Sequence, residues 1–183
     1  MIRAFIAVTL APESVRHIAG CIAELSPHLP GVRWVPAGNL HVTLKFLGWI
    51  DEQRIPPLAS ALEEAFKDFS RFSIHAKGLG VFPGVKRARV LWVGLEGHDL
   101  IKLAERVETS LEPLGFAREA RSFTAHLTIG RWREYARAPV ELQRELDRWA
   151  PHEFGASVIE QVALFQSVLH REGPTYHALR VFR

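Results

Sequence analysis

Two short segments of this sequence share one pattern: a histidine, any residue, a threonine and then a hydrophobic residue. They are His41-Val42-Thr43-Leu44 and His126-Leu127-Thr128-Ile129. In an extended strand, residues i and i+2 point to the same face. Each segment, called a motif below, therefore places an imidazole beside a hydroxyl and directs its two aliphatic side chains to the opposite face. A fold that accommodates both motifs must bury one face of two separate strands and keep the other face accessible.

Strands and helices alternate along the rest of the chain, as judged from the period of the hydrophobic residues. Pro12 and Pro139 mark two helix starts, Asp51 is a typical N-cap, and Gly115 is a typical residue after a helix end. The predicted helices cover residues 12–28, 51–69, 99–114 and 139–149. The predicted strands cover residues 3–10, 32–35, 39–50, 72–82, 89–95, 122–132, 158–170 and 176–182.

The predicted elements repeat after each motif. A helix and then a strand ending in a phenylalanine follow His41, with Phe82 at the end, and the same order follows His126, with Phe165 at a similar spacing. Such a repeat indicates two similar lobes related by a pseudo-two-fold axis, with one motif from each lobe meeting at the axis. A chain of 183 residues suits one domain, residues 1–183, built from these two lobes.

The composition restricts the class of protein. Hydrophobic residues make up 48% of the chain and charged residues 23%, which indicates an ordinary globular domain. The single cysteine, Cys21, excludes an internal disulfide and a zinc site with several cysteines. No apolar run approaches the roughly 18 residues of a membrane span, and residues 2–8 form a short strand pattern rather than a signal peptide. We therefore expect a soluble cytoplasmic protein without membrane association.

Two histidines on opposite sides of a cleft suit the cleavage of a phosphodiester without a metal ion. One neutral imidazole accepts a proton from the attacking water, and the other, as imidazolium, protonates the departing oxygen. Because the unperturbed pKa of histidine is near 6.5, both forms coexist near neutral pH. The hydroxyls of Thr43 and Thr128 can donate to the non-bridging phosphate oxygens. The pattern predicts His41 and His126 as an acid–base pair and leaves open which of them is the acid.

Three further residues are candidates for contacts to the substrate. Arg131 is a natural anion ligand, but strict alternation places it on the face opposite His126, so it requires a bulge or the end of the strand to reach the site. Lys45 falls on the motif side of its strand by the same alternation, although a solvated surface lysine fits the pattern equally well. Phe82 can stack on a base, with core packing as the alternative role for a strand aromatic.

A metal site that uses both motif histidines is the main chemical alternative. It needs a third ligand, and no histidine, aspartate or glutamate lies at a ligand spacing such as His-x-x-x-His. We therefore expect neither a metal ion nor another cofactor in the reaction.

The motifs occur together with other recognisable segments, and the combination resembles the two-histidine (2H) phosphoesterase superfamily. Within it, the chain is most similar to the bacterial and archaeal RNA 2′,3′-cyclic phosphodiesterases, also called 2′-5′ RNA ligases. The similarity runs from Arg3 to the C-terminus. The segments that carry it are Val32-Arg33-Trp34-Val35, residues 39–48 around the first motif, Gly80-Val81-Phe82-Pro83, Arg89-Val90-Leu91-Trp92, residues 162–167 and Gly173-Pro174-Thr175-Tyr176.

The resemblance implies a fold, an activity and roles for residues. The fold is α+β and bilobal, with two antiparallel β-sheets flanked by helices and a central cleft that carries both motifs. The activity is the metal-independent opening of a 2′,3′-cyclic phosphate to a 2′-phosphomonoester. By position, His41 is the proton donor to the departing 3′ oxygen and His126 the acceptor that activates water. Thr43 and Thr128 hold the phosphate, and Arg131 matches a basic residue that follows the second motif in this family.

The chain departs from the family pattern next to this arginine. Members more usually carry an alanine where this chain has Gly130, and a smaller apolar residue where it has Trp132.

The expected partner is RNA with a 2′,3′-cyclic phosphate end, with tRNA-derived ends as one candidate, and the expected state is a monomer. Three other functions remain open. The same residues could run the reverse reaction, in which a 5′-hydroxyl replaces water and forms a 2′-5′ linkage. The substrate could instead be a small cyclic nucleotide or ADP-ribose cyclic phosphate. A binding module for RNA ends without catalysis is the non-enzymatic alternative, and two titratable groups argue against it.

Overall fold

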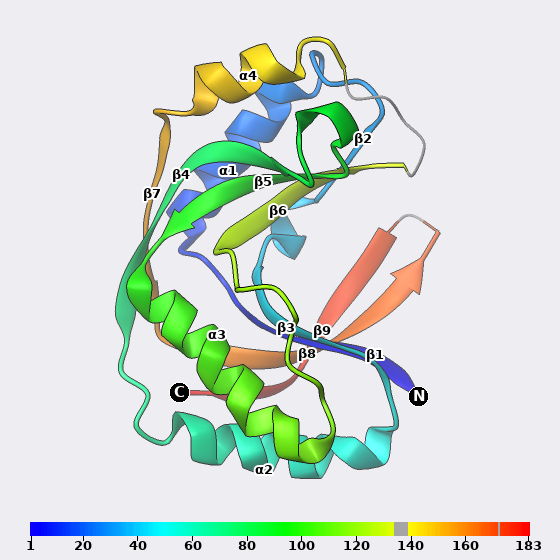
Figure 1. The fold of residues 1–183 in the computed structure, drawn as a ribbon, viewed down its shortest axis with the longest axis vertical. Helices are drawn as coiled ribbons and strands as arrows, with labels where there is room; N and C mark the ends of the chain where they lie inside the picture. The colour runs from blue at the N-terminus through cyan, green and yellow to red at the C-terminus, as the bar shows by residue number, and fades with distance from the viewer. Residues whose placement is uncertain (134–138, 172) are drawn as a thin grey trace.

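The computed structural model describes residues 1–133, 139–171 and 173–183, which form two antiparallel sheets and their flanking helices (Figure 1). Sheet A has the strand order β3-β1-β8-β9 and sheet B the order β2-β6-β5-β4-β7. The strands of sheet A are β1 (Ile2–Val8), β3 (Val42–Ile50), β8 (Val162–His170) and β9 (Gly173–Phe182). The strands of sheet B are β2 (Val32–Trp34), β4 (Phe72–Phe82), β5 (Val90–Glu96), β6 (His126–Trp132) and β7 (Glu153–Ile159). The helices are α1 (Pro12–Leu25), α2 (Ile55–Phe66), α3 (His98–Leu111) and α4 (Leu142–Trp149).

The predicted fold class, an α+β fold with two antiparallel sheets flanked by helices, is confirmed. The single long strand expected over residues 158–170 is wrong. The chain turns at Glu160 and Gln161, and the residues on either side belong to β7 in sheet B and β8 in sheet A. Apolar residues lie on both sides of Glu160 and Gln161, and no glycine or proline marks the turn, so the strongest sequence signal of a turn is missing.

Several element starts also differ from the prediction, among them β3 at Val42 rather than residue 39 and β9 at Gly173 rather than residue 176. The carboxylate of Asp51 does act as a cap, because it accepts a hydrogen bond from the backbone of Gln53, but it caps a short 3₁₀ turn, and α2 begins only at Ile55. The second motif strand begins at His126 itself rather than at residue 122, and α4 begins at Leu142 rather than at residue 139.

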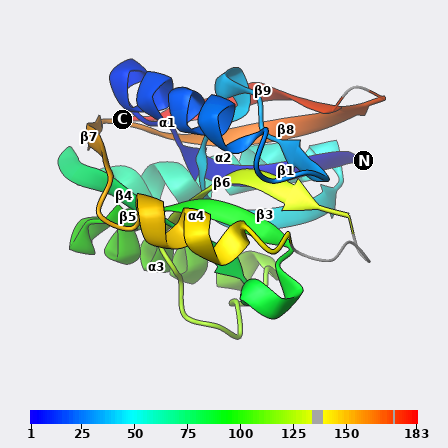
Figure 2. The ribbon, with the colours of Figure 1, turned by 90° about the horizontal axis from the view of Figure 1, so that it is seen from above.

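The helices cover the two sheets in a crossed arrangement. Helices α2 and α3 contact strands of sheet A, whereas α1 and α4 contact strands of sheet B. In the view from above, α4 is drawn in front of β4 and β5 of sheet B, and α1 lies beside them (Figure 2). Helix α1 follows a strand of sheet A yet packs on β7, and α3 follows a strand of sheet B yet packs on β3. Each sheet is therefore covered in part by a helix that starts from the other sheet.

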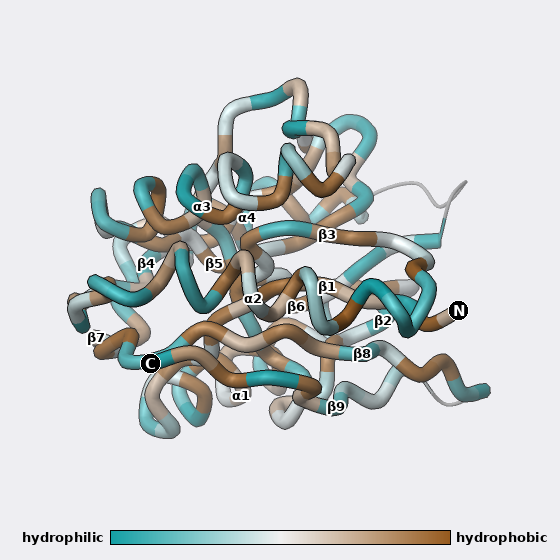
Figure 3. Tube along the Cα trace, turned by 90° about the horizontal axis from the view of Figure 1, so that it is seen from below, coloured by the Kyte–Doolittle hydropathy of each residue, from teal (hydrophilic) through white to brown (hydrophobic). Residues whose placement is uncertain are grey.

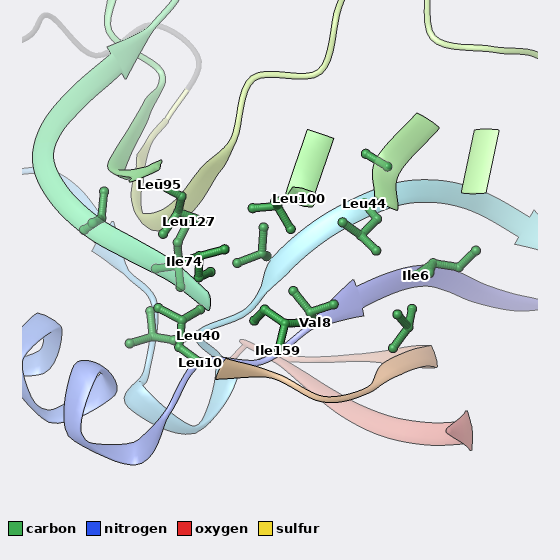
Figure 4. Close-up of a cluster of buried hydrophobic side chains, with 14 of the residues drawn as sticks. Ile6, Val8, Leu10, Leu40, Leu44, Ile74, Leu95, Leu100, Leu127 and Ile159 are labelled. Atoms are coloured by element: carbon green, nitrogen blue, oxygen red, sulfur yellow. The ribbon is translucent and has the colours of Figure 1, made fainter. Parts of the chain in front are cut away.

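One hydrophobic core joins the two sheets. Aliphatic residues from β1, β3, β4, β5, β6, β7 and α3 meet in a single cluster (Figure 4). The aliphatic residues of both motifs belong to it, namely Val42, Leu44, Leu127 and Ile129, and none of them is more than 4% exposed. Hydrophilic segments lie on turns of the helices and at the ends of hairpins (Figure 3). Burial of one face of each motif strand is thus as predicted and holds the polar face in place. Within the described ranges, no helix is long and apolar enough to cross a membrane.

Candidate active site

Both motif histidines are held by the backbone in the same way. His41 Nδ1 lies 2.7 Å from the carbonyl oxygen of Asn39, and His126 Nδ1 lies 2.7 Å from the carbonyl oxygen of Thr124. A carbonyl oxygen only accepts hydrogen bonds, so Nδ1 of each ring carries the hydrogen and donates it. The neutral form of each imidazole therefore presents the lone pair of Nε2, the nitrogen that is available for proton transfer.

A β-bulge brings Arg131 to the face that carries the second motif. In the pairing of β5 with β6, Thr128 lies opposite Trp92, and Arg131 lies opposite Val90, so Ile129 is the extra residue. Trp92 and Val90 are two positions apart and share a face, and the residues opposite them share it as well. The bulge that Arg131 requires is thus present, and Arg131 and Thr128 lie on one face of sheet B.

The first motif strand contains a bulge at the equivalent position. Thr43 lies opposite Ala7, and Phe46 lies opposite Phe5, with Leu44 as the extra residue. Phe46 therefore shares a face of sheet A with Thr43, just as Arg131 shares a face with Thr128. We call these two faces the motif faces of sheets A and B. The residue five positions after the histidine is an exposed aromatic on one motif face and a cation on the other.

The same bulge moves Lys45 away from the site, and both sequence interpretations of Lys45 are wrong. It lies opposite Ile6, on the core side of sheet A, and is only 3% exposed. Its Nζ lies 2.5 Å from a carboxylate oxygen of Glu108 in α3 and donates a hydrogen bond of 2.8 Å to the carbonyl oxygen of Ala117. Lys45 is a buried structural cation that connects β3 to the helix covering it.

The positive charge of Arg131 affects the pKa of both motif histidines. Burial lowers the pKa of His41, the backbone hydrogen bond to Asn39 opposes this shift, and the positive charge of Arg131 lowers the pKa further. The pKa of His126 is lowered by burial in the same way, raised by its bond to Thr124 and lowered by Arg131. Because one guanidinium disfavours both imidazolium ions, both histidines lie within its electrostatic range. Strands β3 and β6 also contact each other directly.

Aromatic rings surround each histidine. On sheet B, the ring of Phe82 meets His126 edge to face at 5.0 Å between centroids, and Trp92 lies 6.1 Å from the same imidazole. The indole of Trp92 lies over Gly80, where any Cβ would fall 2.1 Å from the ring. The structure thus places Phe82 beside His126. Because Gly80 has no side chain, the indole of Trp92 fits over it next to the same histidine.

Tyr176 is a site residue that the sequence reasoning missed. Its ring lies 5.0 Å from that of His41, edge to face, and Phe5 lies 4.8 Å from the same imidazole. Burial raises the pKa of Tyr176, and the charges of Arg131 and Arg3 act in the opposite direction. The residue stands in a segment that carries the family resemblance, but nothing in its spacing to His41 connects the two in the sequence.

The departure from the family pattern at Gly130 has a packing reason. Gly130 lies opposite Trp34 in the pairing of β2 with β6. A Cβ at this position would lie 2.5 Å from a methyl group of Val32 and 3.2 Å from the indole of Trp34. Glycine therefore allows β2 to pack closely against the second motif strand, and Arg131 keeps its place on the motif face.

A scan of protein families agrees with this geometry. The family described as LigT like Phosphoesterase matches the chain twice, over residues 8–92 and 93–176. The chain belongs to the LigT-like phosphoesterase family. The two successive matches agree with the repeat predicted from the sequence, and each contains one motif.

Relatives of this LigT-like phosphoesterase cover it over its whole length. The RNA 2′,3′-cyclic phosphodiesterase of Archaeoglobus fulgidus is 35% identical over 181 residues, covering 98% of this chain and 99% of the relative. The protein of the same name from Aquifex aeolicus is 36% identical, covering 100% and 97%. Among solved structures, TT0787 of Thermus thermophilus superposes with a TM-score of 0.83 at 27% identity, covering 99% of this chain and 97% of that one.

Proposed function

We propose that this LigT-like phosphoesterase hydrolyses the 2′,3′-cyclic phosphodiester ends of RNA to 2′-phosphomonoesters. One observation carries the proposal: two histidines on different sheets, each with Nδ1 anchored on a backbone carbonyl, lie within range of one guanidinium, that of Arg131. A phosphate between these groups would meet an acid, a base and a fixed positive charge. The name shared by the relatives from A. fulgidus and A. aeolicus supports the substrate.

The reaction requires one proton transfer on each side of the phosphorus. We assign His126 as the base, whose Nε2 takes a proton from the attacking water while the water oxygen bonds to phosphorus. We assign His41 as the acid, whose Nε2 proton passes to the 3′ oxygen as the bond between phosphorus and that oxygen breaks. Placement on two facing sheets suits these roles, because the attacking and departing oxygens lie on opposite sides of the phosphorus.

The hydroxyls and the guanidinium stabilise the charge that accumulates on the phosphate. Thr43 and Thr128 share the motif faces with their histidines, so that each can donate to a non-bridging oxygen. Arg131 adds a planar pair of donors that fits phosphate. Phe82, beside His126, offers an apolar surface for the terminal base or ribose.

The finer features of the substrate and of the cellular setting are part of the same proposal. We assign tRNA-derived ends as one natural substrate, and a monomer acting in the cytoplasm as the working form. The reverse reaction, 2′-5′ ligation, uses the same groups with a 5′-hydroxyl in place of water, and hydrolysis dominates in dilute solution because water is in excess.

Incubation with an RNA that ends in a 2′,3′-cyclic phosphate tests the function directly. We expect conversion to a 2′-phosphate without any 3′-phosphate, and the same rate in the presence of EDTA, since the two imidazoles supply both proton transfers. Chromatography against authentic 2′- and 3′-phosphates reads the product. A 3′-phosphate product, or no turnover of RNA and of mononucleotide alike, would contradict the proposal.

The pH dependence of the reaction should report the charge of Arg131. With one acid and one base, the profile of kcat/KM is bell-shaped. Arg131 lowers both histidine pKa values. In Arg131→Gln, the loss of a positive charge favours both imidazolium forms, so both limbs of the bell should move to higher pH. The rate should fall about tenfold to a hundredfold with the lost charged hydrogen bonds.

The measurement is kcat/KM from about pH 4 to pH 9 at constant ionic strength, a range that spans histidine titration. Arg133→Gln is the matched control, since it removes the same charge two residues further along the chain. A slower Arg131→Gln enzyme with an unmoved profile would show that the guanidinium does not act on the histidines.

A further inference from the structure

Beyond the two histidines, the motif face of sheet A continues into a strip with three exposed side chains. A second bulge follows the first in β3, with Leu47 as the extra residue, so that Phe46 lies opposite Phe5 and Trp49 lies opposite Arg3. Arg3, Phe5 and Ala7 alternate along β1, and the residues opposite them share their face. Thr43, Phe46 and Trp49 therefore point to one side of β3, in steps of three rather than two.

The two aromatic residues of this strip are much more exposed than Phe5 on the same face. Phe46 is 54% exposed and Trp49 is 63% exposed, whereas Phe5 beneath them is 3% exposed. The ring of Phe46 rests 6.2 Å from that of Phe5, which supports it from below. Two large apolar rings in water next to an active site are the kind of surface that marks a binding region.

The strip also carries positive charge. Arg3 is exposed, and its two cross-strand neighbours, Trp49 and Ser167, are uncharged. The charge of Arg3 lowers the pKa of both Tyr176 and Arg131, so Arg3 lies within electrostatic range of these two residues of the site. An arginine beside exposed aromatic rings is an arrangement with which proteins bind single-stranded nucleic acid.

We propose that this strip binds the nucleotides on the 5′ side of the terminal cyclic phosphate, with bases stacked on Phe46 and Trp49 and a linking phosphate held by Arg3. The inference rests on the proposed function and specifies its substrate as an oligonucleotide rather than a mononucleotide. Phe46 and Trp49 lie opposite Phe5 and Arg3, which are two residues and so about 7 Å apart along β1, and this places the two rings roughly one extended nucleotide apart.

A comparison of two substrates tests the strip: a nucleoside 2′,3′-cyclic phosphate and a trinucleotide that ends in the same group. We expect the wild-type enzyme to prefer the trinucleotide in kcat/KM. Trp49→Ala should lower kcat/KM for the trinucleotide by about tenfold, the loss of one stacked base. It should leave the mononucleotide unchanged, because the partners of Trp49 and Thr43 on β1, Arg3 and Ala7, are four residues and so about 13 Å apart. Trp49→Phe should keep most of the preference.

Two further variants separate stacking from charge and from general surface effects. In Arg3→Gln, the slope of log kcat/KM for the trinucleotide against log salt concentration should become shallower by about one, the loss of one phosphate contact. Ile101→Ala removes an apolar side chain that is 44% exposed on α3, outside the strip, and should change neither rate.

Equal wild-type activity on both substrates, or a loss in Trp49→Ala that is the same for both, would overturn the inference. So would an unchanged trinucleotide rate in Trp49→Ala combined with a loss of self-association in sedimentation, since the strip would then be covered by a second copy of the chain. Fluorescence anisotropy with a 5′-labelled trinucleotide measures binding to the strip independently of turnover. If the wild-type enzyme cleaves neither substrate yet Trp49→Ala weakens this binding, the proposed function is wrong, whereas the proposed binding of nucleotides by the strip is supported.

Discussion

Replacement of His41 or His126 by alanine is expected to lower the rate of cyclic phosphate hydrolysis by about a hundredfold to ten-thousandfold, the usual contribution of one positioned acid or base. Each ring makes one backbone hydrogen bond, through Nδ1, and leaves Nε2 for the substrate. Loss of either ring therefore removes one proton transfer without disturbing the sheets. The measurement is kcat on the cyclic RNA end, with circular dichroism and a thermal melt to verify folding.

The roles of the two residues can be separated with a modified substrate. In a cyclic phosphate whose bridging 3′ oxygen is replaced by sulfur, the leaving group departs without a proton. His41→Ala should recover most of its rate on this substrate, whereas His126→Ala should remain slow because water still needs a base. The opposite result would exchange the two roles. His75→Ala, an exposed histidine in β4, is the control and should have wild-type activity on both substrates.

Loss of the charge at Lys45 is expected to destabilise the fold by roughly 3 kcal/mol, because removal of one partner of a buried ion pair leaves the other charge without compensation. In Lys45→Met, the carboxylate of Glu108, whose side chain is 13% exposed, would lose its ammonium partner, and the carbonyl of Ala117 would lose a donor. Urea unfolding measures the change as a lower midpoint. The rate per folded molecule should stay close to wild type, since Lys45 lies on the core side of β3.

The double variant Lys45→Met with Glu108→Leu is the matched control for this prediction. It removes both charges and fills the site with apolar groups, so it should recover a large part of the lost stability. A Lys45→Met protein as stable as wild type would mean that the ion pair contributes nothing. A double variant less stable than the single one would mean that Glu108 holds α3 through contacts other than Lys45.

The motif strands could be predicted because short-range pattern and burial agree in them. The alternation of Val42 and Leu44 with His41 and Thr43 is a local property, and the structure buries the first pair and orients the second toward the site. The fold class and the family could be predicted as well, from the repeat of elements and from the resemblance of the motif segments. The functional roles of His41 and His126 are still predictions that the experiments above address.

The side-chain directions beyond each motif could not be predicted, because two-residue alternation does not reveal a bulge. Leu44 and Ile129 are the extra residues, and each reverses the alternation after its threonine. Arg131 reaches the motif face for this reason, and Lys45 leaves it for the same reason. The extra residue is aliphatic in both bulges, so the residue itself gives no signal of a bulge in the sequence.

Contacts between strands that are distant in the sequence could not be predicted either. Tyr176 lies on β9 and meets His41 through the pairing of β1 with β8 and of β8 with β9, which depends on where the chain crosses from one sheet to the other. That crossing, at Glu160 and Gln161, lies between two apolar segments and contains no glycine or proline, so two strands of different sheets were predicted as one.

The crossed helices make the two matched segments depend on each other for packing. Helix α1 lies in the first matched segment and packs on β7 of the second, while α3 lies in the second and packs on β3 of the first. Each sheet also combines strands from both segments, so a single segment on its own could complete its sheets and cover them only by pairing with a second copy, as in a domain-swapped dimer. In the present chain both segments belong to one polypeptide, so equivalent positions need not carry the same residue. Position 131 is an arginine, whereas its counterpart, position 46, is a phenylalanine.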